Sequence, residues 1–251
     1  MPTFSSDGLT LAYFDEGQGE PIVLVHGFAS SIATNWIGPS WTTTLIGAGR
    51  RVIAIDNRGH GASEKPTDPE RYRSPLMADD VAALLDHLDI ERADLMGYSM
   101  GARISAFFAL AHPRRARSLI LGGLGMGLVK GVGDESDIVA ALEAPSLAEV
   151  TSERGRMFRA FAEQSKGDLR ALAACMRALR ARVMTPEDVA RITAPTLIAV
   201  GTRDAIAGDP HGLAALMPNA KVLEITNRDH MPAVGDKIFK QGALAFLSER
   251  P

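Results

Sequence analysis

The sequence contains one cysteine and no long hydrophobic run. Cys175 stands alone among 251 residues, so the chain cannot form an internal disulfide. Its alanine-rich surroundings predict a buried, unreactive side chain. No apolar stretch reaches the roughly 20 residues that span a bilayer, and the first residues lack the basic start and apolar run of a secretion signal. We therefore expect a cytoplasmic protein without a membrane segment.

An excess of either charge is also missing. The chain has 27 basic and 30 acidic residues, and neither sign forms a long block. Nucleic-acid and membrane-surface binding usually require a basic patch. The balance instead favours a small, roughly neutral molecule as the partner, with no nucleic acid and no membrane. The chain itself is expected to be a monomer or a homodimer.

Patterns that hold metals or phosphates are absent as well. His87, His112 and His211 show no ligand spacing, and there are no paired cysteines. The glycine-rich stretch "GGLGMGLVKGVG", residues 122–133, lacks the Gly-Lys-Ser/Thr ending of a phosphate-binding loop. We expect neither a metal nor another cofactor, and we interpret the glycines as a flexible hinge.

Short apolar runs rich in Val, Ile and Leu recur along the chain, and each ends at Gly, Asp, Ser or Asn. Helix-length segments such as residues 76–90 separate them. Near-continuous apolar strands that alternate with amphipathic helices predict an α/β fold, with a mostly parallel sheet covered by helices on both faces. The more regularly alternating "LTLAYFDEG", residues 9–17, predicts an antiparallel edge hairpin. The six apolar runs begin at Pro21, Arg51, Ala93, Ala116, Pro195 and Lys221.

Residues 123–192 interrupt this alternation. After the glycine-rich start, helices are expected over 138–144, 154–164, 168–183 and 185–192, with Asp168 and Thr185 as N-caps of the last two. The insertion falls between two strands, at the sheet edge where ligands bind in open α/β sheets. We interpret 123–192 as a helical lid (cap) on a core domain formed by 1–122 and 193–251.

Apolar lid side chains are candidates for substrate contacts. Their adaptable, hydrophobic character suggests a small to medium apolar acyl or alcohol group. The same helical spacing is equally compatible with simple core packing. The candidates are Met126, Leu128, Met157, Phe158, Phe161 and Met176.

One serine lies between two glycines in "LMGYSMGARI", residues 95–104, directly after an apolar run. On its own this pattern says little, because about one chain in ten of this length would contain it by chance. Two further strands, however, are followed by Asp204 and His230. Because the carboxyl ends of parallel strands share one edge of the sheet, Ser99, Asp204 and His230 are expected at the same crevice.

The chain resembles the α/β-hydrolases in several segments. They are the His26-Gly27 turn, "DNRGHGASEKP", the Gly-Tyr-Ser-Met-Gly segment, the helical insertion, "GTRDAIAG" and the histidine before the last helix. The resemblance implies a roughly eight-stranded sheet. It also implies Ser99 as nucleophile, Asp204 as acid and His230 as base.

Elementary chemistry assigns the same roles. A serine hydroxyl is a weak nucleophile at neutral pH, and a histidine can take its proton during attack. A carboxylate on the other ring nitrogen fixes the tautomer. The helix after Ser99 leaves the Met100 N–H unpaired, and the resemblance adds the Phe28 N–H, which together would form an oxyanion hole.

Asp229, His26 and His60 offer other assignments for the site. Asp229 adjoins His230 in sequence, but neighbouring residues of an extended loop point apart. The strand at 116–122 ends without a carboxylate, which favours Asp204. His26 and His60 are expected to support the loops that carry them.

The leading function is hydrolysis of an ester-like small molecule, as in carboxylesterases and lactonases, through an acyl-enzyme on Ser99. Related dehalogenases and epoxide hydrolases carry Asp at this position. The alternatives are a carbon-carbon bond hydrolase of ring-cleavage products, a cofactor-free perhydrolase and a non-catalytic binding protein. Asn35-Trp36 resembles the carbon-carbon hydrolases, whereas Tyr98 and the "HGFASS" loop depart from them.

Overall fold

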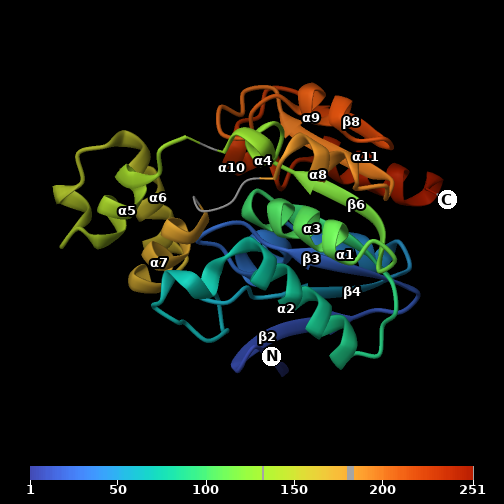
Figure 1. Cartoon of the computed structure of the whole chain (residues 1–251), viewed down its shortest axis with the longest axis horizontal. Coiled ribbons are helices and arrows are strands. Elements are labelled where there is room, and N and C mark those ends of the chain that lie inside the picture. The colour runs from blue at the N-terminus through green and yellow to red at the C-terminus, as the bar shows by residue number, and fades with distance from the viewer. Residues whose placement is uncertain (132, 180–183, 251) are drawn as a thin grey trace.

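The computed structural model describes residues 1–131, 133–179 and 184–250 (Figure 1). Within these ranges one sheet has eight strands in the order β1-β2-β4-β3-β5-β6-β7-β8. The six strands from β4 to β8 in this order are mutually parallel, which confirms the predicted fold class. The strands are β1 (Thr3–Ser6), β2 (Leu9–Glu16), β3 (Glu20–Val25), β4 (Arg50–Ile55), β5 (Ala93–Tyr98), β6 (Ala116–Gly122), β7 (Thr196–Gly201) and β8 (Ala220–Ile225).

The strand predicted over 9–17 does form an antiparallel edge hairpin, but it pairs with the strand before it in the chain, β1. β2 pairs antiparallel with β1 across the Asp7-Gly8 turn. On its other side β2 pairs antiparallel with β4, which lies between β2 and β3. The glycine-rich turn after β2 therefore carries the chain past β4 rather than closing a hairpin.

Helices cover both faces of the sheet, as predicted. Ile22 and Leu24 of β3 lie in one apolar cluster, which includes residues of α1 and α11. Val23 and Val25 alternate with them and belong to the cluster on the opposite face, with α2 and α3. Strands buried on both faces need continuous apolar sequence. The core helices are η1 (Ala33–Ile37), α1 (Trp41–Gly47), η2 (Pro69–Tyr72), α2 (Ser74–His87), α3 (Met100–Ala111), α9 (Pro210–Leu216), α10 (His230–Ala233) and α11 (Lys237–Glu249).

The insertion between β6 and β7 is helical. In Figure 1, α5, α6 and α7 lie together beyond one end of the sheet. Asp168 accepts from the backbone at the start of α7, and Thr185 forms a capping box with Asp188 at α8. Residues 180–183 of the helix expected over 168–183 lie outside the described residues. The elements are α4 (Gly127–Lys130), α5 (Ser136–Glu143), η3 (Leu147–Glu149), α6 (Glu153–Gln164), α7 (Leu169–Leu179) and α8 (Pro186–Ala190).

Residues 125–127 of the glycine-rich stretch are hydrogen-bonded to the core, whereas the flexible hinge expected over 122–133 stays a prediction. The N–H groups of Gly125 and Gly127 both donate to the Ala207 carbonyl, at 2.9 and 3.0 Å. The Met126 N–H donates to the Asp209 carbonyl at 2.9 Å. Glycine is needed here because a Cβ on Gly125 would lie 2.5 Å from the Gly208 carbonyl oxygen. The segment is thus joined to the loop that follows β7.

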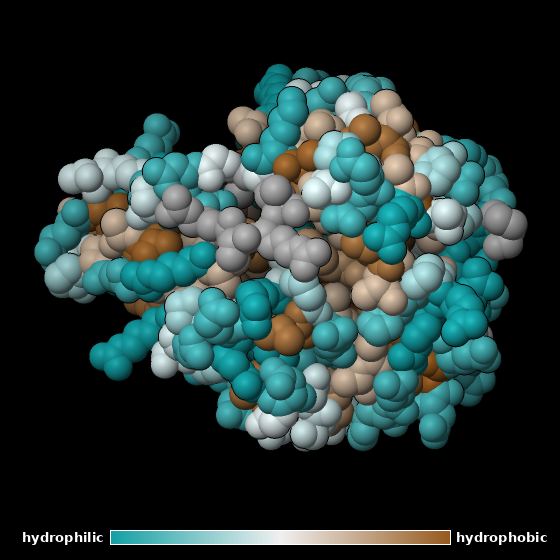
Figure 2. Space-filling model, in the orientation of Figure 1, coloured by the Kyte–Doolittle hydropathy of each residue, from teal (hydrophilic) through white to brown (hydrophobic). Residues whose placement is uncertain are grey.

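Hydrophilic side chains cover much of the face shown in Figure 2, with hydrophobic patches between them. Of the helices in the described ranges, none combines the length and apolar character needed to cross a bilayer. Cys175 is fully buried in α7, with its Sγ 3.7 Å from the Met100 Sδ.

Candidate active site

Ser99 occupies a tight corner between β5 and α3. Its backbone has φ 54° and ψ −112°, a strained conformation for a residue with a Cβ. A Cβ on Gly97 would lie 2.2 Å from the Gly101 carbonyl oxygen, and one on Gly101 would lie 1.9 Å from the Val25 carbonyl oxygen. The two glycines therefore allow the helix to start directly against the strands.

His230 and Asp204 complete a hydrogen-bonded chain with Ser99. The His230 Nε2 lies 3.0 Å from the Ser99 Oγ, and the Nδ1 lies 2.7 Å from the Asp204 Oδ2. Asp204 follows β7, and His230 follows β8 and begins α10. Loops after three parallel strands thus bring the three sequence-predicted residues to one edge of the sheet.

The surroundings of Asp204 keep it ionised. Burial is the largest single influence and opposes ionisation, but the hydrogen bond to His230, the charge of that ring and two backbone N–H groups together lower the pKa of Asp204. These N–H groups belong to Ile206 and Ala207 and donate to the Asp204 Oδ1 at 2.8 and 2.9 Å. An ionised Asp204 requires the His230 Nδ1 to carry a proton, which leaves Nε2 free to accept from Ser99.

Tyr98 contacts His230 through its hydroxyl group and its ring. Its hydroxyl donates to the His230 carbonyl at 2.6 Å, and the two rings lie 5.6 Å apart. Burial raises the pKa of Tyr98, so the hydroxyl remains a donor. The residue that departs from the carbon-carbon hydrolase pattern therefore has a positioning contact.

The two residues predicted to supply an oxyanion hole both lie at the serine cavities. Met100 is the first residue of α3, so its N–H has no acceptor within the helix. Phe28 lies in the loop after β3 and lines the same cavities as Ser99. The Asn35 Oδ1 accepts from the Gly27 N–H at 3.1 Å and so supports this loop.

His26 and His60 lie buried beneath the loop. The His26 Nδ1 lies 2.7 Å from the Gly27 carbonyl, and its Nε2 accepts from the Asn57 N–H at 3.0 Å. The His60 ring lies 5.2 Å from His26 and 5.9 Å from Phe28. Burial lowers the pKa of His26 to about 4 and that of His60 to about 3. Both rings are therefore neutral supports of the loop at neutral pH.

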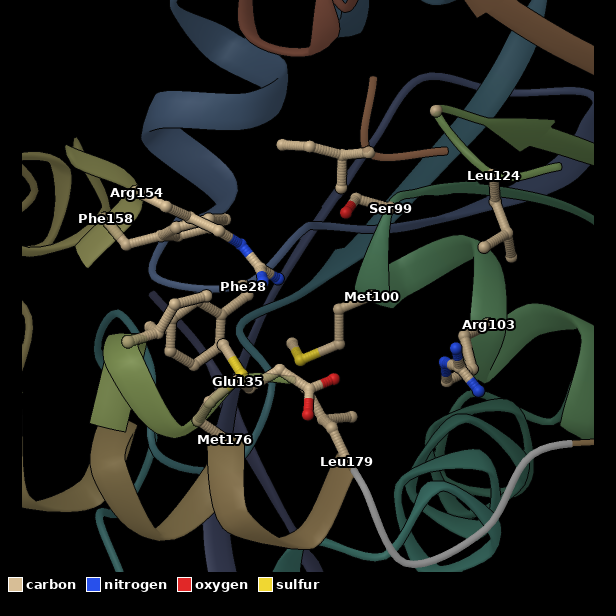
Figure 3. A pocket seen from close by; sticks show the side chains of 13 residues that line it. Phe28, Ser99, Met100, Arg103, Leu124, Glu135, Arg154, Phe158, Met176 and Leu179 are labelled. Carbon is tan, nitrogen blue, oxygen red and sulfur yellow. The ribbon is translucent and has the colours of Figure 1, made fainter. Parts of the chain in front are cut away.

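Two cavities meet at Ser99, each about 600 Å³ with open solvent included. The rings of Phe28 and Phe158 line both, with their centroids 6.0 Å apart. We name the first the Arg103 cavity; it contains Met100, Arg103, Leu124, Glu135, Ile138 and Met176 (Figure 3). We name the second the His230 cavity; it contains Thr34, Asn35, Tyr98, Phe161, His230 and Met231.

Of the six apolar lid candidates, Phe158, Phe161 and Met176 line these cavities. Phe158 lines both cavities and Phe161 lines the His230 cavity. Met126, Leu128 and Met157 line neither, which corrects their prediction as substrate contacts. Leu128 is fully buried in the core, whereas Met157 is 40% exposed on the outer side of α6. Met126 packs near Gly212, because α4 is bonded to the loop after β7.

Several residues that line the two cavities were not predicted from the sequence. Leu124 follows β6, Ile206 lies two residues after Asp204, and Met231 follows His230. Proximity to the strand ends could have indicated these three. Arg103 lies one helical turn after Ser99, and its spacing alone could have indicated it.

The remaining histidines each lie beside one polar partner, and His87 and His112 also pack against aromatic rings. His87 lies near the Tyr13 hydroxyl, His112 near Asp79 and His211 near Glu224. In the part of the chain that the structure describes, no three His, Cys, Asp or Glu side chains are grouped to hold a metal ion.

The profile of the α/β-hydrolase fold family matches residues 20–167, which include the serine corner. The chain belongs to this family.

Individual relatives include enzymes of different specificity. A 2-hydroxymuconate semialdehyde hydrolase of Pseudomonas sp. (strain CF600) is 37% identical over 116 residues, which cover 46% of this chain and 40% of that protein. A hydrolase from Pseudomonas aeruginosa PA01 superposes with TM-score 0.82 at 26% identity, covering 98% and 97% of the two chains. Est816, described as an N-acyl homoserine lactone degrading enzyme, has TM-score 0.75 and 26% identity over 98% and 99%. The match to the first relative spans less than half of its length.

Proposed function

We propose that the protein is a serine hydrolase that cleaves ester-like substrates through an acyl-enzyme on Ser99. The single observation that carries this proposal is the hydrogen-bonded chain from Ser99 through His230 to Asp204, at 3.0 and 2.7 Å. The strained serine corner and the oriented, ionised carboxylate support it.

The proposed reaction has two halves. The Ser99 Oγ attacks the substrate carbonyl carbon while its proton passes to the His230 Nε2. The carbonyl oxygen becomes an oxyanion that accepts from the Phe28 and Met100 N–H groups. The alcohol oxygen leaves with the proton from His230. Water, deprotonated by the same nitrogen, then releases the acid and restores Ser99.

The two cavities have separate parts in this reaction. His230 lines only the cavity that bears its name. Because the leaving oxygen takes its proton from the His230 Nε2, we place the leaving group in the His230 cavity. The acyl group then occupies the Arg103 cavity, against Met100 and Leu124.

We also propose that residues 123–192 act as a lid over both cavities. Phe158 of α6 closes each of them, and Met176 of α7 adds to the Arg103 cavity. These side chains are apolar and favour small to medium hydrophobic groups. The lid sets which substrates enter, whereas the core supplies the chemistry.

A second candidate is hydrolysis of a carbon-carbon bond in a ring-cleavage product. The Asn35 Nδ2 is buried in the wall of the His230 cavity, and no hydrogen-bond partner for it exists among the described residues. The 2-hydroxymuconate semialdehyde hydrolase similarity points the same way. A screen of esters, lactones and ring-cleavage dienones with the purified protein separates the two candidates. A hydrolase of ester-like bonds cleaves esters or lactones fastest, whereas a carbon-carbon bond hydrolase cleaves the dienones fastest.

The direct test compares wild type with Ser99→Ala on p-nitrophenyl butyrate. We expect the variant to lose at least 10³-fold in kcat, since the nucleophile is absent. Ser248→Ala serves as the control, because this exposed serine at the end of α11 bonds only to the Ala245 carbonyl. Equal turnover by wild type and Ser99→Ala would exclude the acyl-enzyme.

A further inference from the structure

Arg103 is a buried cation in the wall of the Arg103 cavity. It is only 6% exposed, although it lies one turn after Ser99 on α3. Its Nη2 donates to the Gly127 carbonyl at 2.9 Å. Its Nη1 is buried, and among the described residues it has no hydrogen-bond partner. Figure 3 shows Arg103 further along α3 than Met100, at the edge of the cavity that Ser99 also lines.

An unpaired buried donor on a charged group is costly. Such a group loses its water and gains no bond in return. Burial lowers the pKa of Arg103, whereas the nearby Glu135 carboxylate opposes this. A guanidinium remains protonated at neutral pH, so the Nη1 is a strong donor without an acceptor among the described residues, on a side chain that lines the cavity.

Three charged side chains line the cavity: the cations of Arg103 and Arg154 and the carboxylate of Glu135. Glu135 lines the cavity with Arg103, and its charge offsets that of the guanidinium. Arg154 donates to the Asp134 carbonyl at 2.8 Å and lies 3.9 Å from Asp137. A substrate carboxylate would meet the like charge of Glu135, whereas a keto, ether or ester oxygen adds no charge.

We propose that Arg103 recognises a neutral oxygen in the acyl part of the substrate. The preferred substrates are then esters or lactones whose acyl chain carries a keto or similar acceptor oxygen several carbons from the bond that is cleaved. This inference rests on the proposed function, because it takes the acyl group to occupy the Arg103 cavity.

The position of the oxygen follows from the helix. Arg103 begins about 6 Å further along the α3 axis than Ser99. An acyl chain attached to Ser99 and lying along α3 therefore passes Met100 before an oxygen reaches the Nη1. An oxygen directly beside the scissile carbonyl is too close.

The experiment uses p-nitrophenyl 4-oxohexanoate, 5-oxohexanoate, hexanoate and the mono-ester of adipate. For wild type, kcat/KM for the better oxo ester is expected to exceed that for hexanoate about tenfold or more, because hexanoate leaves the Nη1 unpaired. The adipate mono-ester is expected to be slower than the oxo esters. In Arg103→Gln the oxo preference falls to within about threefold of unity. Arg177→Gln is the matched control, since this half-exposed arginine of α7 pairs with Glu143 and lines neither cavity.

The outcomes are separable. Equal rates for the oxo esters and hexanoate in wild type overturn the inference without any variant, so a misfolded Arg103→Gln does not protect it. A preference that persists in folded Arg103→Gln also overturns it, and so does a preference for the adipate ester. If Ser99→Ala hydrolyses p-nitrophenyl acetate as fast as wild type, the proposed function itself fails. Ser99-dependent hydrolysis without an oxo preference refutes only the role of Arg103.

Discussion

At the scale of single residues, the contact between His230 and Asp204 sets the tautomer that can accept the Ser99 proton. The family resemblance, the loop argument and the strand at 116–122, which ends without a carboxylate, all favoured Asp204 over Asp229. In the structure the His230 Nδ1 contacts Asp204, which is fixed by backbone N–H groups of its own loop. Distances of this kind depend on how β7 and β8 align, and no local pattern encodes that alignment.

Replacing Asp204 tests the pairing. Asp204→Asn is expected to fold and to lose on the order of 10⁴-fold in kcat, because an amide at this place favours the wrong tautomer of His230. Ester hydrolysis and a thermal melt measure the two effects. Asp229→Asn is the matched control and should stay within about threefold of wild type. Comparable losses in both variants would remove Asp204 from its proposed role.

At the scale of elements, helices were easier to predict than the direction of their side chains. The pattern placed Met157 and Phe158 together as substrate contacts, yet one is exposed and the other lines both cavities. Adjacent residues of a helix point about 100° apart. The rotation of α6 is set by its packing against α5, which sequence spacing does not specify.

The serine corner gives an element-scale prediction. In Gly101→Ala the added methyl would lie 1.9 Å from the Val25 carbonyl oxygen, so α3 must move away from β3. We expect a loss of about 1–3 kcal/mol in the free energy of unfolding together with most of the esterase activity. Urea unfolding and ester hydrolysis measure the two.

Gly47→Ala is the control for this helix glycine. Nothing lies within 4 Å of a Cβ at Gly47, the last residue of α1. Alanine there is expected to leave activity unchanged and to stabilise by up to ~1 kcal/mol. If Gly101→Ala were as stable and active as Gly47→Ala, the close contact at the corner would not exist.

At the scale of the whole molecule, the six apolar runs correspond to the six strands β3 to β8. For β3 to β7 the reason is that burial on both sheet faces requires continuous apolar sequence, whereas β8 is a partly exposed edge strand. The insertion of β4 between β2 and β3 was not predicted, and neither was β1. Strand order depends on contacts far apart in sequence, and a four-residue edge strand carries too little pattern to detect.

The buried histidines predict how the stability of the whole chain depends on pH. The pKa of His26 is lowered to about 4 and that of His60 to about 3, mainly by burial. Between pH 6.5 and 4, the unfolded chain therefore binds protons that the folded chain does not. The free energy of unfolding is therefore expected to decrease as the pH falls through this window, by up to ~1.4 kcal/mol per pH unit for each histidine.

Urea unfolding at pH 7 and pH 5 measures this slope. His60→Asn should reduce the acid sensitivity, whereas His211→Asn should not, since His211 is exposed beside Glu224. An unchanged slope in His60→Asn would show that His60 accepts a proton in the folded state.

The proposed mechanism requires a covalent acyl group on Ser99. Trypsin releases residues 93–103 as one peptide, in which Ser99 is the only serine. Wild type is quenched in acid during turnover of p-nitrophenyl butyrate, digested and analysed by mass spectrometry. We expect one butyryl group on this peptide, absent in Ser99→Ala, at a level that rises when deacylation is slowed. Turnover that proceeds with no acyl group on this peptide, or with the acyl group on another peptide, would contradict it.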